Sequence, residues 1–308
     1  MYGDEIFMKN YLGGMKMPKI ISIIEAFQGL IKNKHVDVIQ FPNKGTGSVF
    51  GCVADLGQEI KLIRAFNNEE VANYSLAEIQ ATNEQTIERL KSTYSFRVDE
   101  IIESGPLGQV LQEEWFEAGD ILYICSTELM TKSMQASYEK AISIAWRKHC
   151  PIVFNVLLNG ATSDQMNENQ ALLKRYIDIS DIIIVNETDL PPLTGINNEQ
   201  EAIKSLLRQV PTVVYTKSMH GSRVYTRAYQ VSHSGMFVPK EEKAKAHDVF
   251  VGAFLTQLLM HQVHGEIAID KLKMYEILHY STSQSYFIEL GSEKNQDYEV
   301  YTKKNQAM

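Results

Sequence analysis

The chain has 308 residues, of which 44% are hydrophobic and 22% are charged, and its formal net charge at pH 7 is −8. This composition is that of an ordinary globular protein and excludes collagen-like, broadly disordered and disulfide-stapled scaffolds. The acidic balance argues against binding to a nucleic-acid backbone, because proteins that do so normally present a basic surface. The length allows one large domain or two smaller ones.

The cysteines and the N-terminus indicate a cytoplasmic protein without a membrane anchor. Cys52, Cys125 and Cys150 are odd in number and widely spaced, so they predict free thiols in a reducing compartment. Residues 1–17 lack the basic and apolar regions of a secretory signal, and we expect them to form a flexible extension. The longest apolar runs are far shorter than the roughly 20 residues that a membrane span needs.

Short runs rich in β-branched residues recur along the chain and predict strands. Continuous apolar runs of this kind are typical of strands buried on both faces of a parallel sheet. The predicted strands lie at 19–24, 121–125, 151–154, 181–185, 212–215 and 223–226.

Helical patterns lie between these runs, at 134–149, 170–176 and 199–208. The last of them has Asn198 as its predicted N-cap and Glu201 three residues later, which is an Asn variant of the capping box. Strand and helix alternate from about residue 120 to about residue 260. This alternation predicts an α/β fold with a mostly parallel sheet and helices on both faces.

Two segments do not follow the alternation. Residues 67–118 are polar and contain a Gly105-Pro106 turn, and we expect helices there together with an irregular or small lid segment. Residues 293–308 are polar, and we expect a tail that frays or adds an edge strand near 298–301.

Three motifs in the second half of the chain carry polar residues at the ends of predicted elements. In the first, the strand 181–185 runs into residues 186–189 (Asn-Glu-Thr-Asp) and then 193–195 (Leu-Thr-Gly). The second contains Thr216 and Gly221, and the third is the stretch 245–255. In this order and spacing they resemble the PfkB/ribokinase family of sugar and nucleoside kinases, over roughly residues 18–292.

The resemblance implies a fold, an activity and partners. The expected fold is a ribokinase-like doubly wound, mostly parallel sheet flanked by helices, forming one domain over 18–292. A small and reduced β lid is expected from segments near 32–48 and 90–110. The implied activity is ATP-dependent, Mg²⁺-assisted transfer of a phosphoryl group to a sugar hydroxyl, closer to the fructokinase or ketodeoxygluconate kinase types than to adenosine kinases. The implied ligands are a sugar and a nucleotide, and pairing through the lids would give a homodimer.

Phosphoryl transfer depends on positioning and electrostatic stabilisation, which explains the residue types that the family uses. An Asp takes the proton from the attacking hydroxyl, backbone amides hold phosphate, and Mg²⁺ is held largely through water. The resemblance assigns Asp248 as the catalytic base, Asn186, Glu187 and Asp189 to the metal, Lys245, Ala246, His247, Thr216, Ser218 and Gly221 to phosphate or nucleotide, and Glu25, Gly29, Asn43, Lys44 and Ser48 to the sugar.

The sequence also departs from the family pattern on both sides of the expected site. Lys245 and His247 replace the two glycines of the phosphate loop, and their side chains would crowd the phosphate path. Gly29 replaces the sugar-binding Asp, which removes a hydrogen-bonding partner. Losses on both sides favour weak activity or, alternatively, a catalytically inactive protein with a binding or regulatory role.

Simpler structural interpretations remain open for the same residues. Asp248 is expected near the start of a helix, where an N-cap is a common role for Asp. Residues 186–189 would also serve as a capping loop, and Lys245 with His247 as a solvated polar turn. His261 and His264 are better explained as an exposed helix end than as a metal site, since no third ligand follows. An unrelated fold would separate Asp248 from residue 186.

Overall fold

The computed structural model describes residues 18–25, 46–58, 60–65, 102–103, 111–130, 132–158, 163–217, 220–235, 243–261 and 269–290. Its strands form a nine-stranded sheet, whose order is β3-β2-β1-β4-β5-β6-β7-β8-β9. In chain order these strands are β1 (Ile20–Glu25), β2 (Ile60–Ala65), β3 (Ile102–Glu103), β4 (Ile121–Cys125), β5 (Ile152–Val156), β6 (Ile182–Asn186), β7 (Thr212–Thr216), β8 (Ser222–Thr226) and β9 (Gln230–His233).

The sheet is parallel from β3 to β7 and antiparallel at the β8–β9 edge. From β1 the chain first adds β2 and β3 on one side and later returns to add β4 on the other side. The strand order therefore reverses between β1 and β4. In open α/β sheets, ligands bind beyond the carboxyl ends of the strands at such a switch point.

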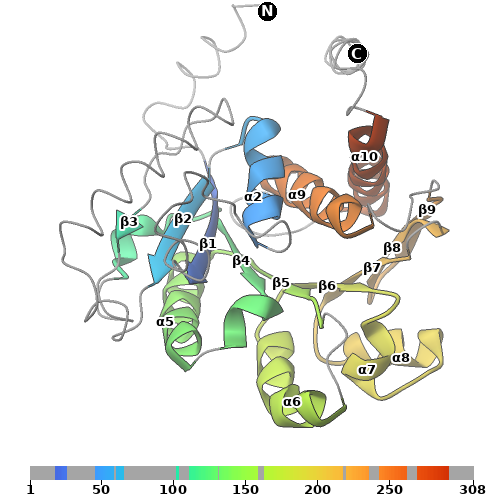
Figure 1. Cartoon of the computed structure of the whole chain (residues 1–308). Coiled ribbons are helices and arrows are strands. Elements are labelled where there is room, and N and C mark those ends of the chain that lie inside the picture. The colour runs from blue at the N-terminus through green and yellow to red at the C-terminus, as the bar shows by residue number, and fades with distance from the viewer. Residues whose placement is uncertain are drawn as a thin grey trace, which may run out of the picture.

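Helices cover both faces of the sheet (Figure 1), with α5, α6, α7 and α8 on one side and α2, α9 and α10 on the other. The helices are α2 (Thr46–Asp55), α5 (Lys132–Lys148), α6 (Ser163–Asp178), α7 (Leu190–Thr194), α8 (Glu199–Leu206), α9 (Lys243–His261) and α10 (Lys271–Leu290), with 3₁₀ helices at Glu113–Trp115 and Ser126–Met130. None of the helices in the described ranges is long and apolar enough to cross a membrane.

Two hydrophobic cores correspond to the two helical layers. Alternate residues of each central strand point into opposite cores: Ile182 and Ile184 pack with α9 and α10, whereas Ile183 and Val185 pack on the α5–α8 side. Burial on both faces accounts for the uninterrupted apolar runs in the sequence. Gly252 allows α9 to approach α2 closely, because a Cβ there would lie 2.8 Å from the Cys52 Cβ.

The predicted α/β class and the doubly wound, mostly parallel sheet are confirmed, and each predicted strand occurs within one or two residues of its expected bounds. The Asn198 cap is also confirmed, because its Oδ1 accepts from the Glu201 amide at 3.1 Å. Helix α9 differs from the prediction, since it begins at Lys243 rather than near Asp248. The predicted extension at 1–17, the tail at 293–308 and most of both lid segments lie outside the described residues.

Candidate active site

The candidate site lies at the carboxyl edge of the sheet, where β4, β5, β6 and β7 end. Asn186 ends β6 and pairs across the ladder with Thr216, which ends β7. The Glu187 amide donates to the Thr216 carbonyl at 2.9 Å. The metal-side and nucleotide-side motifs, 30 residues apart in the sequence, are thus neighbours in the sheet.

Asn186 organises the turn that follows β6. Its Oδ1 accepts from the amides of Thr188 and Asp189, each at 2.9 Å, and from the Thr188 hydroxyl at 2.7 Å. Its Nδ2 donates to Asp189 Oδ2 at 2.7 Å. These bonds form an Asx-type turn, so the Asn186 side chain already has structural partners at both ends.

Asp189 and Glu187 differ in their surroundings. Asp189 is buried, its Oδ2 also accepts from the Leu158 amide at 3.2 Å, and burial raises the pKa of its carboxyl. Glu187 is half-buried, and its carboxylate has no hydrogen bond to any described residue. Mg²⁺ retains much of its water shell and needs few protein carboxylates. Glu187 therefore fits a hydrated Mg²⁺, whereas Asn186 and Asp189 mainly build the turn.

His247 of α9 crosses the carboxyl edge from one strand to another. Its Nδ1 lies 3.4 Å from Thr216 Oγ1 on β7, and its Nε2 lies 3.3 Å from Asn155 Oδ1 on β5. Strand β6 runs between these two strands, so the ring lies across β6. Asn155 is fully buried, and its Nδ2 donates to the Tyr123 hydroxyl at 2.9 Å.

The protonation of His247 follows from these partners. Because Asn155 Oδ1 accepts only, Nε2 carries the proton and Nδ1 accepts from the Thr216 hydroxyl. Desolvation by burial lowers the pKa of His247 to about 4. The ring is thus neutral at physiological pH and carries no positive charge for a phosphate.

Asp248 is buried, with 2% of its surface exposed, beside the end of β4. Its charge is one of the influences that raise the pKa of Tyr123 and of Cys125, although burial is the main cause for both groups. Asp248 cannot be an N-cap, because α9 begins five residues earlier. Its carboxylate therefore lies within the second turn of a helix, near Tyr123 and Cys125 of β4, one of the two strands that border the switch point.

The start of α9 determines what the expected phosphate loop offers. In a helix that begins at Lys243, the His247 and Asp248 amides donate to the carbonyls four residues earlier. The sequence predicts these amides as part of the anion site, but here they are used within the helix. The residues present therefore do not form a phosphate cradle in this conformation.

Gly221 is required by the β7–β8 hairpin. Its φ is +84°, and a Cβ there would lie 2.0 Å from the His233 carbonyl oxygen. Its own carbonyl accepts from the Lys217 amide at 2.7 Å. Gly221 thus closes the hairpin that carries Thr216, whereas Ser218 lies outside the described residues.

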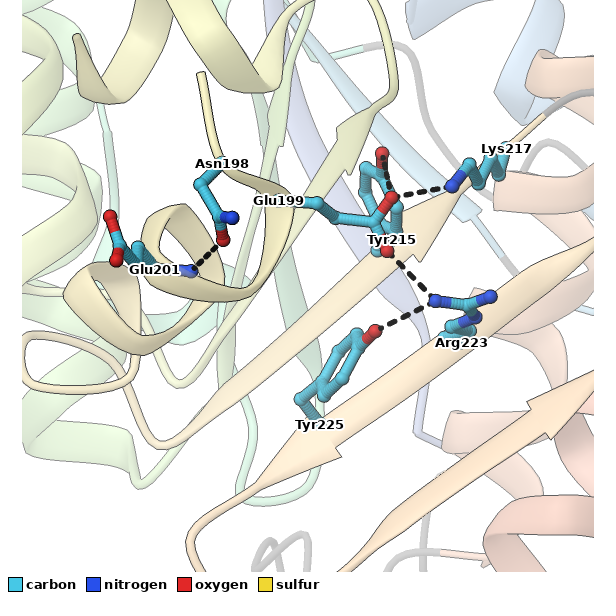
Figure 2. Close-up of polar contacts among 7 residues, drawn as sticks. All are labelled: Asn198, Glu199, Glu201, Tyr215, Lys217, Arg223 and Tyr225. Carbon is cyan, nitrogen blue, oxygen red and sulfur yellow. Dashed lines mark hydrogen bonds and ion pairs between the residues drawn. The ribbon is translucent and has the colours of Figure 1, made fainter. Parts of the chain in front are cut away.

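A polar cluster on the opposite face of this hairpin was not predicted (Figure 2). Glu199 Oε1 accepts from Arg223 Nη1 at 2.8 Å, and Oε2 accepts from Lys217 Nζ at 2.5 Å and from the Tyr215 hydroxyl at 3.3 Å. Arg223 also approaches the Tyr225 hydroxyl, at 3.4 Å. Burial opposes ionisation, but the hydrogen bond from Lys217 and the two cations lower the pKa of Glu199. The sequence signal that could have indicated this cluster is the alternation of polar residues along 215–225.

The sugar side of the expected site is only partly described. Glu25 ends β1 and Ser48 lies in α2, so both are on elements next to the switch point, but their side chains are not described. The same holds for the Lys245 side chain, whereas Ala246 is half-buried in α9. Gly29, Asn43 and Lys44 lie outside the described residues.

The expectation for the helix-end histidines remains untested as a pair. His261 is half-buried at the end of α9, and His264 lies outside the described residues. Within the described ranges, no three His, Cys, Asp or Glu side chains are grouped so that they would hold a metal ion by themselves.

Comparison with families of known proteins matches residues 66–269 to the pfkB family carbohydrate kinases, which is about two-thirds of the chain. The protein therefore belongs to the pfkB family. Fructokinase-2 of Solanum habrochaites and of Solanum lycopersicum are each 24% identical to it over 173 residues. That match covers 56% of this chain and 52% of each relative, so the chain spans about half the length of the curated relatives it matches.

Solved structures support the fold. Aminoimidazole riboside kinase from Salmonella enterica has a TM-score of 0.65 at 17% identity. Fructokinase from Vibrio cholerae O395, in its fructose, ADP and calcium ion bound form, has a TM-score of 0.65 at 19% identity. Both matches cover 87% of this chain and 92% of the other. A putative ribokinase II from E. coli, in complex with ATP and Mg²⁺, has a TM-score of 0.60 at 16% identity.

Proposed function

We propose that the protein is a cytoplasmic sugar kinase that transfers the terminal phosphoryl group of ATP to a sugar hydroxyl, with Mg²⁺ bound through Glu187. Asp248 accepts the proton of the attacking hydroxyl as that oxygen bonds to phosphorus and ADP leaves. A hexose such as fructose is the first substrate to test, because both curated relatives are fructokinases. Three free, buried cysteines support a reducing compartment.

The observation that carries this proposal is the position of Asp248. It is a buried carboxylate close to Tyr123 and Cys125 of β4, and β4 borders the switch point at which open α/β sheets bind ligands. Its neighbour His247 contacts Thr216, which lies opposite Asn186 in the sheet. The proposed base and the metal-side turn thus belong to one edge, as an in-line transfer between sugar and nucleotide requires.

The test is an assay of ATP consumption and sugar phosphate formation over a panel of hexoses, pentoses and nucleosides. Sugar-dependent ADP release by the wild type, lost in Asp248→Asn, is the expected result. Turnover that survives Asp248→Asn would remove the proposed base. No MgATP binding at millimolar nucleotide would remove the kinase proposal itself.

A second function, binding or regulation without catalysis, is favoured by the helical conformation of 243–248. Amides that donate within a helix are not available to a transferring phosphate. This alternative predicts that sugar binds, with a measurable heat in calorimetry, while ATP is neither bound nor consumed. The two functions therefore differ in one quantity, the affinity for MgATP.

A further inference from the structure

The His247 ring is held at both nitrogens, and its partners come from different strands. Thr216 lies at the end of β7, and Asn155 lies near the end of β5, where Tyr123 holds its amide in place. Residue 247 stands where the resemblance places a bare loop glycine. A side chain fixed in this way connects the start of α9 to the carboxyl edge across β6.

The same contacts keep the start of α9 helical. The ring meets Thr216 and Asn155 from the backbone position that the helix gives residue 247, and in that position its amide donates to the preceding turn. We propose that His247 is a latch, a positioning residue that keeps the first turns of α9 wound and the phosphate-site amides occupied, so that phosphate binding requires its release. This inference rests on the proposed kinase function for its consequence, but the latch itself is a property of the fold.

The latch is expected to be weak enough to open. Both contacts, at 3.3 and 3.4 Å, lie at the long end of the hydrogen-bond range. Two such bonds together shift the equilibrium between wound and open α9 by about tenfold. Lys-Ala-Lys-Ala at 243–246 favours the helix independently of the ring, so intrinsic propensity and latch must be separated by experiment.

Two kinds of variant separate them. His247→Ala removes the ring and retains a helix former, and Thr216→Val removes one partner with little change in shape. Ala244→Gly keeps both contacts and lowers the helix propensity of the same turn. Amide hydrogen exchange over 243–250 and the dissociation constant of MgATP are measured for all of them, with thermal melts to verify folding.

The latch predicts about tenfold faster exchange of these amides in His247→Ala and a smaller increase in Thr216→Val, whereas the lower helix propensity of Ala244→Gly by itself should give up to about fivefold. The MgATP dissociation constant should fall by a similar factor in His247→Ala. Unchanged exchange in both contact variants would overturn the latch, and Thr216→Val tests it without changing helix propensity, because Thr216 lies in β7. Faster exchange without MgATP binding in any variant would retain the latch and overturn the kinase proposal.

Discussion

The two edges of the sheet use their polar side chains in different ways. At the amino edge, Asp120 precedes β4 and accepts from the Lys19 amide and ammonium and from the Glu117 amide, at 2.8 to 2.9 Å. Asp181 precedes β6, and its Oδ2 accepts from the Ile152 amide at 2.8 Å. These carboxylates close the starts of the strands with short bonds to the backbone and to one lysine.

At the carboxyl edge the turn at Asn186 has equally short bonds, of 2.7 to 2.9 Å, but two groups beside it are held more loosely. The His247 bridge spans three strands with contacts of 3.3 and 3.4 Å, and the Glu187 carboxylate has no hydrogen bond within the described part of the chain. Fully satisfied polar networks stabilise and rigidify, whereas groups that must bind a ligand need free capacity. The difference indicates that the amino edge maintains the fold and the carboxyl edge is the site that changes during function.

The largest expected effect comes from neutralising one carboxylate at each edge. Asp248→Asn should lower sugar phosphorylation by about 10²- to 10⁴-fold, the usual contribution of a general base, with a smaller effect on stability. Asp120→Asn should cost roughly 3 kcal/mol of stability, because it disrupts a buried ion pair, and leave kcat near the wild-type value. Denaturant titration and steady-state kinetics measure both; similar profiles for the two variants would contradict the assignment of edges.

The pH dependence of stability isolates His247. In the unfolded protein the ring has its ordinary pKa of 6.5 and is protonated below that pH. In the folded protein, desolvation by burial lowers the pKa of His247 to about 4. The contribution of the neutral ring to the free energy of unfolding is therefore fully present above pH 6.5. It is lost as the pH falls toward 4, by up to roughly 3 kcal/mol. Denaturant melts between pH 7 and pH 4 should show a shallower decline in His247→Ala; parallel curves for both proteins would refute the neutral ring.

In the turn after β6, variants of Asp189 and Glu187 should distinguish a structural role from a role in metal binding. Asp189→Ala removes bonds to Asn186 and the Leu158 amide and should cost about 2 kcal/mol of stability. Glu187→Gln should leave the melting curve unchanged and raise the Mg²⁺ concentration needed for half-maximal activity severalfold. A metal titration of each variant measures this, and a reversed pattern would assign the metal to Asp189.

The smallest expected effect is at the cluster around Glu199. Its partners Lys217 and Arg223 are partly exposed, so Glu199→Gln should cost only about 1 kcal/mol, through weaker attachment of the β7–β8 hairpin to α8. Glu201→Gln is the matched control, because only its backbone amide takes part in the helix cap. Equal losses in chemical denaturation would mean that the cluster contributes nothing specific.

The sheet was predictable because the signal is local and repeated. Strands buried on both faces must be apolar throughout, as in Ile182–Val185, and the Asn198 cap depends on two residues three positions apart. The order of the polar motifs then placed Asn186, Thr216 and Asp248 at one edge, since parallel strands end together. Tyr123, Asn155 and the Glu199 cluster depend on which face of a strand each residue occupies after folding, so they were harder to predict.

The residue at which α9 begins could not be predicted from the motif at 245–255. The resemblance aligned 245–248 with a phosphate loop, and a loop was the natural expectation around Asp248. Local propensity favours the opposite, because lysine and alanine are strong helix formers and no glycine interrupts them before Gly252. His247 adds tertiary contacts to that propensity, so the helix extends through the segment in which the family pattern has glycines.

The central claim is tested most directly by a crystal structure with a non-hydrolysable ATP analogue, Mg²⁺ and fructose. The account predicts the terminal phosphate against the amides of 246–248, with His247 displaced from Thr216. It also predicts a sugar hydroxyl within about 3 Å of the Asp248 carboxylate. Ligands bound away from the carboxyl edge, or bound there with α9 unchanged and His247 still bridging β5 and β7, would contradict it.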